Sequence, residues 1–371
     1  MQVSDLSALN TQVLSAAFLL SVIFGAITQR THFCTMGAVS DVVNMGDWTR
    51  MRQWGLAMGV AMIGFAVMAS TGLIDPAKTI HASNHWLWLS ALVGGSLFGF
   101  GMVLASGCGS KTLVRVGGGS LKSLVVLLVM GLAAFATLKG ITAVLRVETV
   151  DQVAVEFSTI ANLPYLAAAA WGINPAITGL VLGLALGGAL VAWALTGPEF
   201  CRAGNLVGGL GIGAIIVAMW WVSGHLGFVA EHPETLNEVF LTTNSGRAEA
   251  MSFVAPIAYT LDWLLFFSDK NKVLTFGVVS VIGVIAGSAV MALWSRTFRW
   301  EAFGGTEDVA NHLAGAVLMG VGGVTAMGCT IGQGLTGVST LSATSFVALA
   351  AIVAGAVAAF KYQIWRLERM V

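Results

Sequence analysis

Charged side chains are scarce in this chain of 371 residues, at 10% of the total. Soluble domains carry about 25% charged residues. Hydrophobic residues reach 57%, and the mean hydropathy is +0.85. Because so few polar groups cannot cover a water-exposed surface, we predict an integral membrane protein. The 18 basic and 18 acidic residues cancel, so the basic excess of a nucleic-acid-binding protein is missing.

Cysteine is scarce too, and its spacing excludes several kinds of site. Cys34, Cys108, Cys201 and Cys329 lie far apart and form no CxxC pair. The spacing therefore predicts neither a zinc site, nor a redox dithiol, nor a disulfide framework. A GxxxxGK[ST] loop is also missing from the sequence, which excludes an ATPase site of this type. We expect no metal and no cofactor.

Glycine, in contrast, is abundant, with 46 residues against six prolines. This balance is typical of closely packed transmembrane helices. A span needs roughly 20 apolar residues, and stretches without charges predict nine of them. They lie near residues 12–28, 54–73, 87–106, 123–140, 175–195, 206–228, 273–294, 310–327 and 342–360. We predict an all-α polytopic membrane protein in which residues 1–371 form a single transmembrane domain.

The chain contains an internal repeat that ends in a cysteine. Residues 92–108, LVGGSLFGFGMVLASGC, align with residues 313–329, LAGAVLMGVGGVTAMGC, at a constant offset of 221. Duplicated membrane transporters place such interrupted, glycine-rich spans at their substrate path. We therefore predict two repeat halves, residues 1–140 and residues 175–371.

Each copy of the repeat runs into a segment that is unsuited to a continuous helix. These segments are GCGSKTLVRVGGGS (107–120) and GCTIGQGLTGVST (328–340). Irregular backbone at membrane depth is tolerated only where it packs in protein or lines a polar cavity. We predict short, half-inserted helices there; ordinary exposed loops are the alternative.

Orientation follows from the basic residues. An odd number of spans places the two termini on opposite sides of the membrane. Connections on the C-terminal side hold about twice as many lysines and arginines as those on the N-terminal side, which predicts a periplasmic N-terminus and a cytoplasmic C-terminus. The two repeat copies are then antiparallel, with a pseudo-twofold axis in the membrane plane.

A lone cysteine in a membrane is usually a small buried hydrophobe, and this remains our interpretation of Cys201. Duplication at a helix break favours a different role for Cys108 and Cys329. A thiol in apolar surroundings stays protonated and is a weak S–H donor, and helix breaks free backbone N–H groups. Such weak donors suit a small sulfur oxyanion and also let it leave. We interpret His32 and His312 as interfacial residues, although His312 is a plausible pH-sensitive group.

These motifs resemble the YeeE/YedE family of bacterial inner-membrane proteins, which is linked to uptake of thiosulfate and related sulfur compounds. The resemblance rests on HFCTMGAVSD (32–41), GCGSKTLVRVGGGS (107–120) and the segment 298–340 with GCTIGQGLTG. It implies nine long helices in an inverted repeat, several half-inserted helices and an hourglass waist. It also implies that thiosulfate passes along the thiols of Cys34, Cys108 and Cys329. Some relatives work with a small soluble TusA-like sulfur carrier, and others are associated with selenium metabolism.

We therefore interpret the chain as an inner-membrane transporter, not an enzyme, that takes up a small sulfur oxyanion, which we predict to be thiosulfate. Six residues are predicted to shape the constriction and supply backbone donors: Gly107, Gly109, Gly328, Thr330, Gly332 and Gln333. One alternative is a transporter of another sulfur or selenium species. A second is an intramembrane sulfurtransferase with a cysteine persulfide, for which only His32 beside Cys34 offers a general base. A third, a membrane anchor for a soluble carrier, calls for a larger cytoplasmic domain than the short loops provide.

Overall fold

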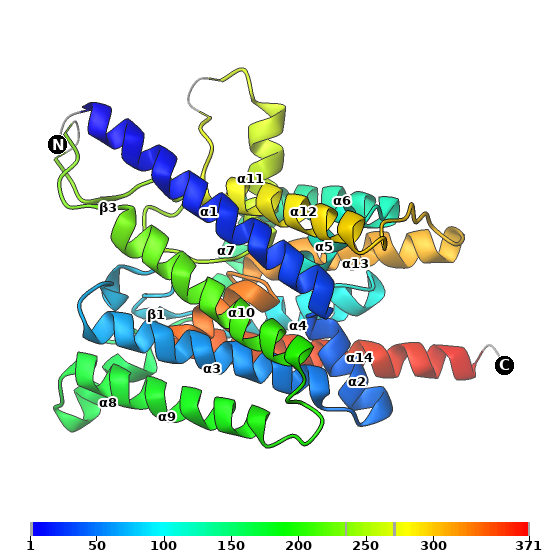
Figure 1. Cartoon of the computed structure of the whole chain (residues 1–371), viewed down its shortest axis with the longest axis horizontal. Coiled ribbons are helices and arrows are strands. Elements are labelled where there is room, and N and C mark those ends of the chain that lie inside the picture. Colours follow the sequence, from blue (N-terminus) through cyan, green and yellow to red (C-terminus); the bar gives the residue numbers. More distant parts are fainter. Residues whose placement is uncertain (1–2, 234–235, 270–271, 370–371) are drawn as a thin grey trace.

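The computed structural model describes residues 3–233, 236–269 and 272–369. Each of the nine predicted spans coincides with a long helix (Figure 1). These helices are α1 (Val3–Thr31), α3 (Thr49–Ser70), α4 (Trp88–Leu104), α6 (Leu121–Lys139), α9 (Pro175–Leu195), α10 (Ala203–Trp221), α12 (Phe276–Trp294), α13 (Thr306–Thr325) and α14 (Ala343–Glu368).

Within the described residues, eight helices are long and apolar enough to cross a membrane. Helix α13 is the long helix that is not among these eight. It has 20 residues, and its first turn carries Glu307 and Asp308, which lower its hydropathy. It packs against α4 and α6 inside the bundle. The prediction of an all-α polytopic membrane protein is confirmed.

Shorter elements connect the long helices or lie between them. The short helices are α2 (Thr35–Met45), α5 (Gly109–Gly117), α7 (Ile141–Glu148), α8 (Leu163–Trp171) and α11 (Val254–Leu265). Single turns are η1 (Pro76–Lys78), η2 (Val150–Gln152), η3 (Val222–Leu226) and η4 (Gly332–Gly337). Two antiparallel ribbons pair β1 (His85–Trp86) with β2 (Val155–Glu156), and β3 (Phe228–Val229) with β4 (Val239–Phe240).

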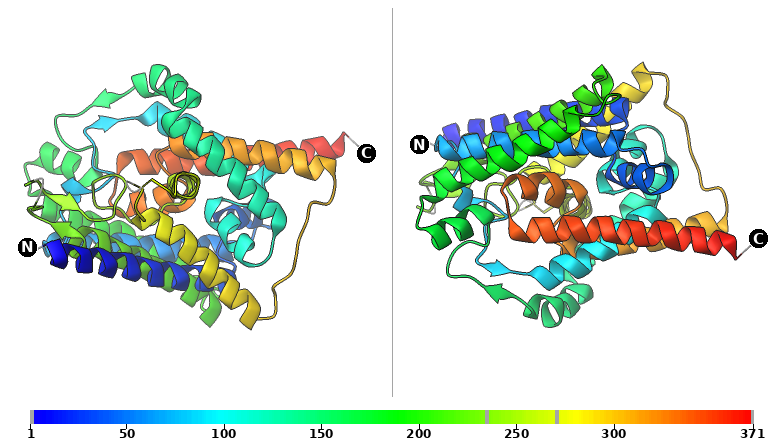
Figure 2. Two further views of the ribbon diagram at one scale, coloured as in Figure 1. Left: turned by 90° about the horizontal axis from the view of Figure 1, so that it is seen from above. Right: turned by 90° about the horizontal axis from the view of Figure 1, so that it is seen from below.

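The two ends of the chain lie at opposite ends of the molecule, as both views in Figure 2 show. An extended segment between α12 and α13 runs along the end where the C-terminus lies. This placement agrees with the odd number of long helices, because an odd number of crossings leaves the termini on opposite sides.

The repeat helices α4 and α13 pack against each other in antiparallel fashion, through glycines. A Cβ atom on Gly94 would lie 2.7 Å from the carbonyl oxygen of Gly322, and one on Gly101 would lie 2.7 Å from that of Gly315. The offset of 221 converts the first pair into the second with the helices exchanged. A contact that maps onto itself in this way is the signature of a twofold axis, so the inverted repeat is a property of the fold.

Both repeat helices end in the same backbone conformation. Ser106 and Met327 follow α4 and α13 with φ values of 55° and 58°, and a helix resumes three residues later in each copy. The offset then grows from 221 to 222, since Ser120 caps α6 and Ser342 caps α14. The second copy absorbs its extra residue in the π-helical turn η4, and such one-residue insertions often occur at functional sites.

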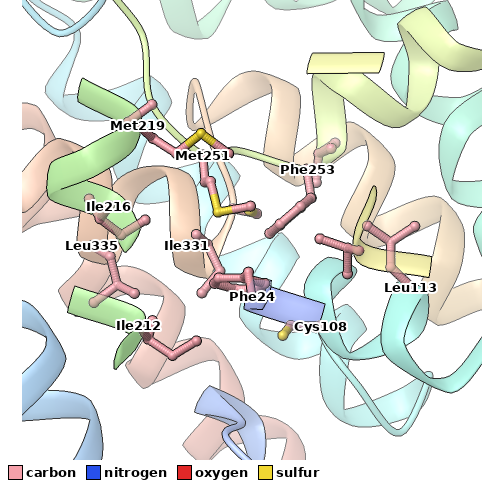
Figure 3. Close-up of a cluster of buried hydrophobic side chains, with 14 of the residues drawn as sticks. Phe24, Cys108, Leu113, Ile212, Ile216, Met219, Met251, Phe253, Ile331 and Leu335 are labelled. Carbon is pink, nitrogen blue, oxygen red and sulfur yellow. The ribbon is translucent and has the colours of Figure 1, made fainter. Parts of the chain in front are cut away.

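The buried core surrounds these breaks. Figure 3 shows Cys108 in a cluster with Phe24, Leu113 and Phe253. The rings of Phe24 and Phe253 lie 5.7 Å apart between centroids. The cluster places apolar walls around the interrupted helices and excludes water from them.

Candidate functional site

The structure brings together the three cysteines that the sequence analysis predicted. The thiols of Cys34 and Cys108 lie within hydrogen-bonding reach of each other, and Cys329 lies near Cys108. All three are buried, and Cys108 and Cys329 are completely inaccessible to solvent. Three segments that are distant in the sequence therefore meet in the buried interior.

Each of these cysteines stands at the start of a helix. Cys34 caps α2, and its sulfur accepts a hydrogen bond from the Gly37 backbone N–H at 3.4 Å. Cys108 occupies the corresponding position before α5. The sulfur of Cys329 accepts the Gly332 N–H, also at 3.4 Å. Because helix N-termini carry unpaired N–H groups and the positive end of the helix dipole, their convergence favours a negative charge.

Hydroxyl groups complete the surroundings of Cys108. Ser110 Oγ lies 3.3 Å from Cys108 Sγ, and the side chain of Thr330 lies within reach of the same thiol. Among the described residues, Thr330 and Thr35 are buried and their hydroxyls bond to no other polar group. A buried polar group without a partner costs about 1–3 kcal/mol. An anion that accepts a hydrogen bond from these hydroxyls would remove this cost.

The six predicted supporting residues differ in their structural roles. The Gln333 side chain donates to the Ala326 carbonyl at 2.6 Å and accepts from Ser345, so it joins η4 to its neighbours and is not a free donor. Gly332 is tightly packed, since a Cβ there would lie 2.5 Å from Ser252 Oγ. Gly328 is also closely packed, with a Cβ position 3.0 Å from Gln333 Cγ.

The first-half glycines have more room. A Cβ on Gly107 would meet Lys111 at 3.4 Å, and one on Gly109 would meet Phe253 at 3.7 Å, which are ordinary contact distances. The role of these glycines in shaping a constriction stays a prediction.

Two cavities flank the cysteines along the length of the molecule. One, of about 230 Å³, lies where α6 ends and α12 begins, and it touches Gly328, Gly332 and Thr336. The other, of about 260 Å³, lies where α1 ends and α6 begins, and it touches His32 and Lys111. None of the three cysteines lines either cavity, and the buried region around them is the predicted constriction.

The first cavity contains ionisable groups whose charge is suppressed by burial. Burial raises the pKa of Glu249 to about 7 and lowers the pKa of His81 to about 4. Glu249 accepts a hydrogen bond from Ser245 at 3.0 Å. Arg146, on the same wall, forms an ion pair with Asp151 at 3.1 Å. In mildly acidic solution the wall is therefore nearly neutral.

The sequence analysis missed Lys111. The ammonium group of Lys111 lies close enough to Cys34 and Cys108 to interact electrostatically with both, although Lys111 was not among the predicted site residues. The signal was available in the motif GCGSK, where the lysine follows Cys108 by three residues. Because the helix starts at Gly109, a spacing of three residues places the Lys111 side chain on the same face as the Cys108 thiol.

Three other candidates lie away from the constriction. The interpretation of Cys201 as a small buried hydrophobe is wrong, because its side chain is exposed, with the sulfur 3.7 Å from the Leu195 carbonyl. His312 is buried and is held by Asp308, with 2.8 Å from Nδ1 to the backbone oxygen. His32 is exposed and lines the second cavity.

Comparison with known proteins agrees with this geometry. A family model described as Sulphur transport matches residues 30–358 and so includes all three clustered cysteines. The chain belongs to the sulphur transport family. Members of this family that resemble it include a thiosulfate transporter, TsuA, from Spirochaeta thermophila. That protein is 28% identical over 340 residues, which cover 89% of this chain and 93% of the relative.

Two further relatives come from Escherichia coli K12. Its thiosulfate transporter TsuA is 25% identical over 344 residues, covering 92% of each chain. Its probable transporter YedE is 32% identical over 110 residues, which are 30% of this chain and 26% of the relative. The two relatives that align with this sulphur transport protein over most of its length are thus transporters.

Proposed function

We propose that this protein takes up thiosulfate, or a closely related small sulfur oxyanion, across the bacterial inner membrane. The observation that carries the proposal is the convergence of Cys34, Cys108 and Cys329 at three helix starts between two cavities. The names of the two full-length relatives support thiosulfate as the ion.

The site suits passage better than tight binding. Thiols are weak donors, and the sulfur of a thiol is polarisable, like the terminal sulfur of thiosulfate. The hydroxyl of Thr330 adds a donor beside Cys108. An ion that replaces its water shell with such donors is bound firmly enough to enter and loosely enough to leave.

A sulfurtransferase that forms a cysteine persulfide is the second candidate, because the thiols are close together. It needs a general base beside a reactive thiol. His32 is exposed whereas Cys34 is buried, which favours transport over covalent chemistry. Transport of a different sulfur or selenium species uses the same geometry and differs only in the preferred ion.

The charge distribution sets the proposed direction. We place the N-terminus in the periplasm and the C-terminus in the cytoplasm, so the cavity with Glu249 receives the ion and the cavity with Lys111 releases it. The resemblance to the YeeE/YedE proteins supports a small TusA-like sulfur carrier as the cytoplasmic acceptor.

Transport is tested with purified protein reconstituted into lipid vesicles and radiolabelled thiosulfate outside. We expect accumulation above that of empty vesicles, with competition by unlabelled thiosulfate stronger than by sulfite, selenite or sulfate. No accumulation by folded protein would contradict the proposal. A mass increment of one sulfur on an intact cysteine, formed without net uptake, would instead support the sulfurtransferase.

A further inference from the structure

The second cavity, of about 260 Å³, has a strongly basic wall. Helix α5 contributes Lys111 and Arg115, the extended segment before α13 contributes Arg299, and the end of α1 contributes His32. One carboxylate, that of Glu301, lines the same space.

Charge is not balanced around this cavity. Glu301 forms an ion pair with Lys122 at 2.7 Å, so its charge is already matched. Arg115 donates to the Ser106 carbonyl at 2.9 Å, which orients the guanidinium without neutralising it. Within the described part of the chain, Lys111 and Arg299 form no ion pair. Three cationic side chains, those of Lys111, Arg115 and Arg299, therefore surround a single carboxylate that is already paired.

Lys111 connects the cavity to the constriction. Its side chain lines the cavity and at the same time interacts with the thiols of Cys34 and Cys108. It is only partly accessible to solvent. Withdrawing an ammonium group from water without a counter-ion is costly, and a bound anion relieves that cost. An anion that leaves the thiols on this side meets Lys111 first.

We propose that this cavity is a second anion-binding site, which takes a small divalent oxyanion, and that Lys111 draws the ion from the thiols into it. Arg115 and Arg299 then hold the ion by charge-assisted hydrogen bonds. The proposal deepens the proposed uptake and rests on it for the direction of movement, but binding to the cavity stands independently of transport.

Equilibrium binding of radiolabelled thiosulfate to detergent-purified protein tests the site, with Lys111→Gln as the main variant. The substitution keeps a polar side chain, shorter by one atom, and removes its charge. We expect the Kd to rise about tenfold, since one charge-assisted contact is lost, and Lys111→Arg to retain most of the affinity. Lys361→Gln removes an exposed lysine of α14 that lies outside the cavity, and it is expected to bind like the wild type.

A second variant guards against misfolding. Arg299 is exposed and lies on an extended segment, so Arg299→Gln is expected to fold normally and to weaken binding as well. Wild-type affinity in both glutamine variants would overturn the second site.

Vesicle uptake separates the two proposals. Weakened binding in Lys111→Gln, together with no uptake by the wild type, would leave the site standing and refute transport. Normal uptake and unchanged binding in Lys111→Gln would refute the site and leave transport standing.

Discussion

The side chain of Thr330 lies within reach of the thiol of Cys108, although the two residues belong to different copies of the repeat. The second copy of the repeat thus supplies part of the polar surroundings of the cysteine in the first copy. A substitution at one cysteine therefore changes a site that both halves build, and we expect the two repeat cysteines to behave alike.

Removal of a repeat thiol is expected to abolish most of the uptake. Cys108→Ala and Cys329→Ala each delete one weak donor but leave the helix starts in place. We expect a stability loss of roughly 1 kcal/mol and normal expression, yet little thiosulfate uptake in vesicles. Near-normal transport by both alanine variants would show that these cysteines are only packing residues.

Serine at the same positions separates donor strength from polarisability. Cys108→Ser and Cys329→Ser retain a hydrogen-bond donor in nearly the same volume, but the hydroxyl is harder and more strongly hydrated. We expect serine to fail nearly as badly as alanine if the soft sulfur matters. Recovery of uptake by serine would mean that any donor is sufficient.

Cys201 provides the matched control. Because its side chain is exposed and lies outside the constriction, Cys201→Ala should keep most of the uptake activity and the wild-type melting temperature. Loss of transport at normal expression would place a functional thiol outside the repeat breaks.

The contact between the repeat helices should be sensitive to a single methyl group. In Gly322→Ala the new Cβ would lie 2.5 Å from the Phe98 backbone nitrogen and 2.6 Å from the Gly94 oxygen. Backbone atoms cannot move away easily, so we expect destabilisation of about 1–3 kcal/mol, seen as a lower melting temperature in detergent. Gly188→Ala has nothing within 4 Å of the new Cβ and should melt like the wild type; equal melting of both variants would argue against close packing on the axis.

Glu249 should make stability depend on pH. Burial raises its pKa from 4.5 to about 7, so between these values the folded state binds more protons than the unfolded state. Stability then falls as the pH rises through this window. His81, whose pKa burial lowers from 6.5 to about 4, acts in the opposite direction between pH 4 and 6.5.

Comparison of the wild type with Glu249→Gln isolates the carboxyl group. We expect the melting temperature of the variant to exceed that of the wild type by an amount that grows from about pH 4.5 to 7. Above pH 7 the difference stays constant, because Glu249 is then ionised in both the folded and the unfolded protein. A difference that does not change with pH would show that Glu249 titrates normally.

The amino-acid sequence alone determined the class of this protein, its long helices and the antiparallel repeat. These features follow from local hydropathy, from the identity between two segments and from the distribution of basic residues, and none of these needs knowledge of distant contacts. The repeat also singled out Cys108 and Cys329, which lie near each other in the structure; their role in transport stays a prediction. The division into halves at residues 1–140 and 175–371 stays a prediction.

Only the tertiary structure decided what surrounds those cysteines. The fold brings Cys34, from a distant segment, to Cys108, and no periodicity in the chain encodes that meeting. Lys111, in contrast, reaches Cys108 along the same short helix. Gln333 was predicted to help shape the constriction and to supply a backbone donor. Its backbone N–H donates to the Cys329 carbonyl, and its side-chain amide bonds to Ala326 and Ser345. The physical reason is the same in each case: hydropathy records whether a residue is buried, whereas the partner of a buried polar group is set by chain segments far away in the sequence.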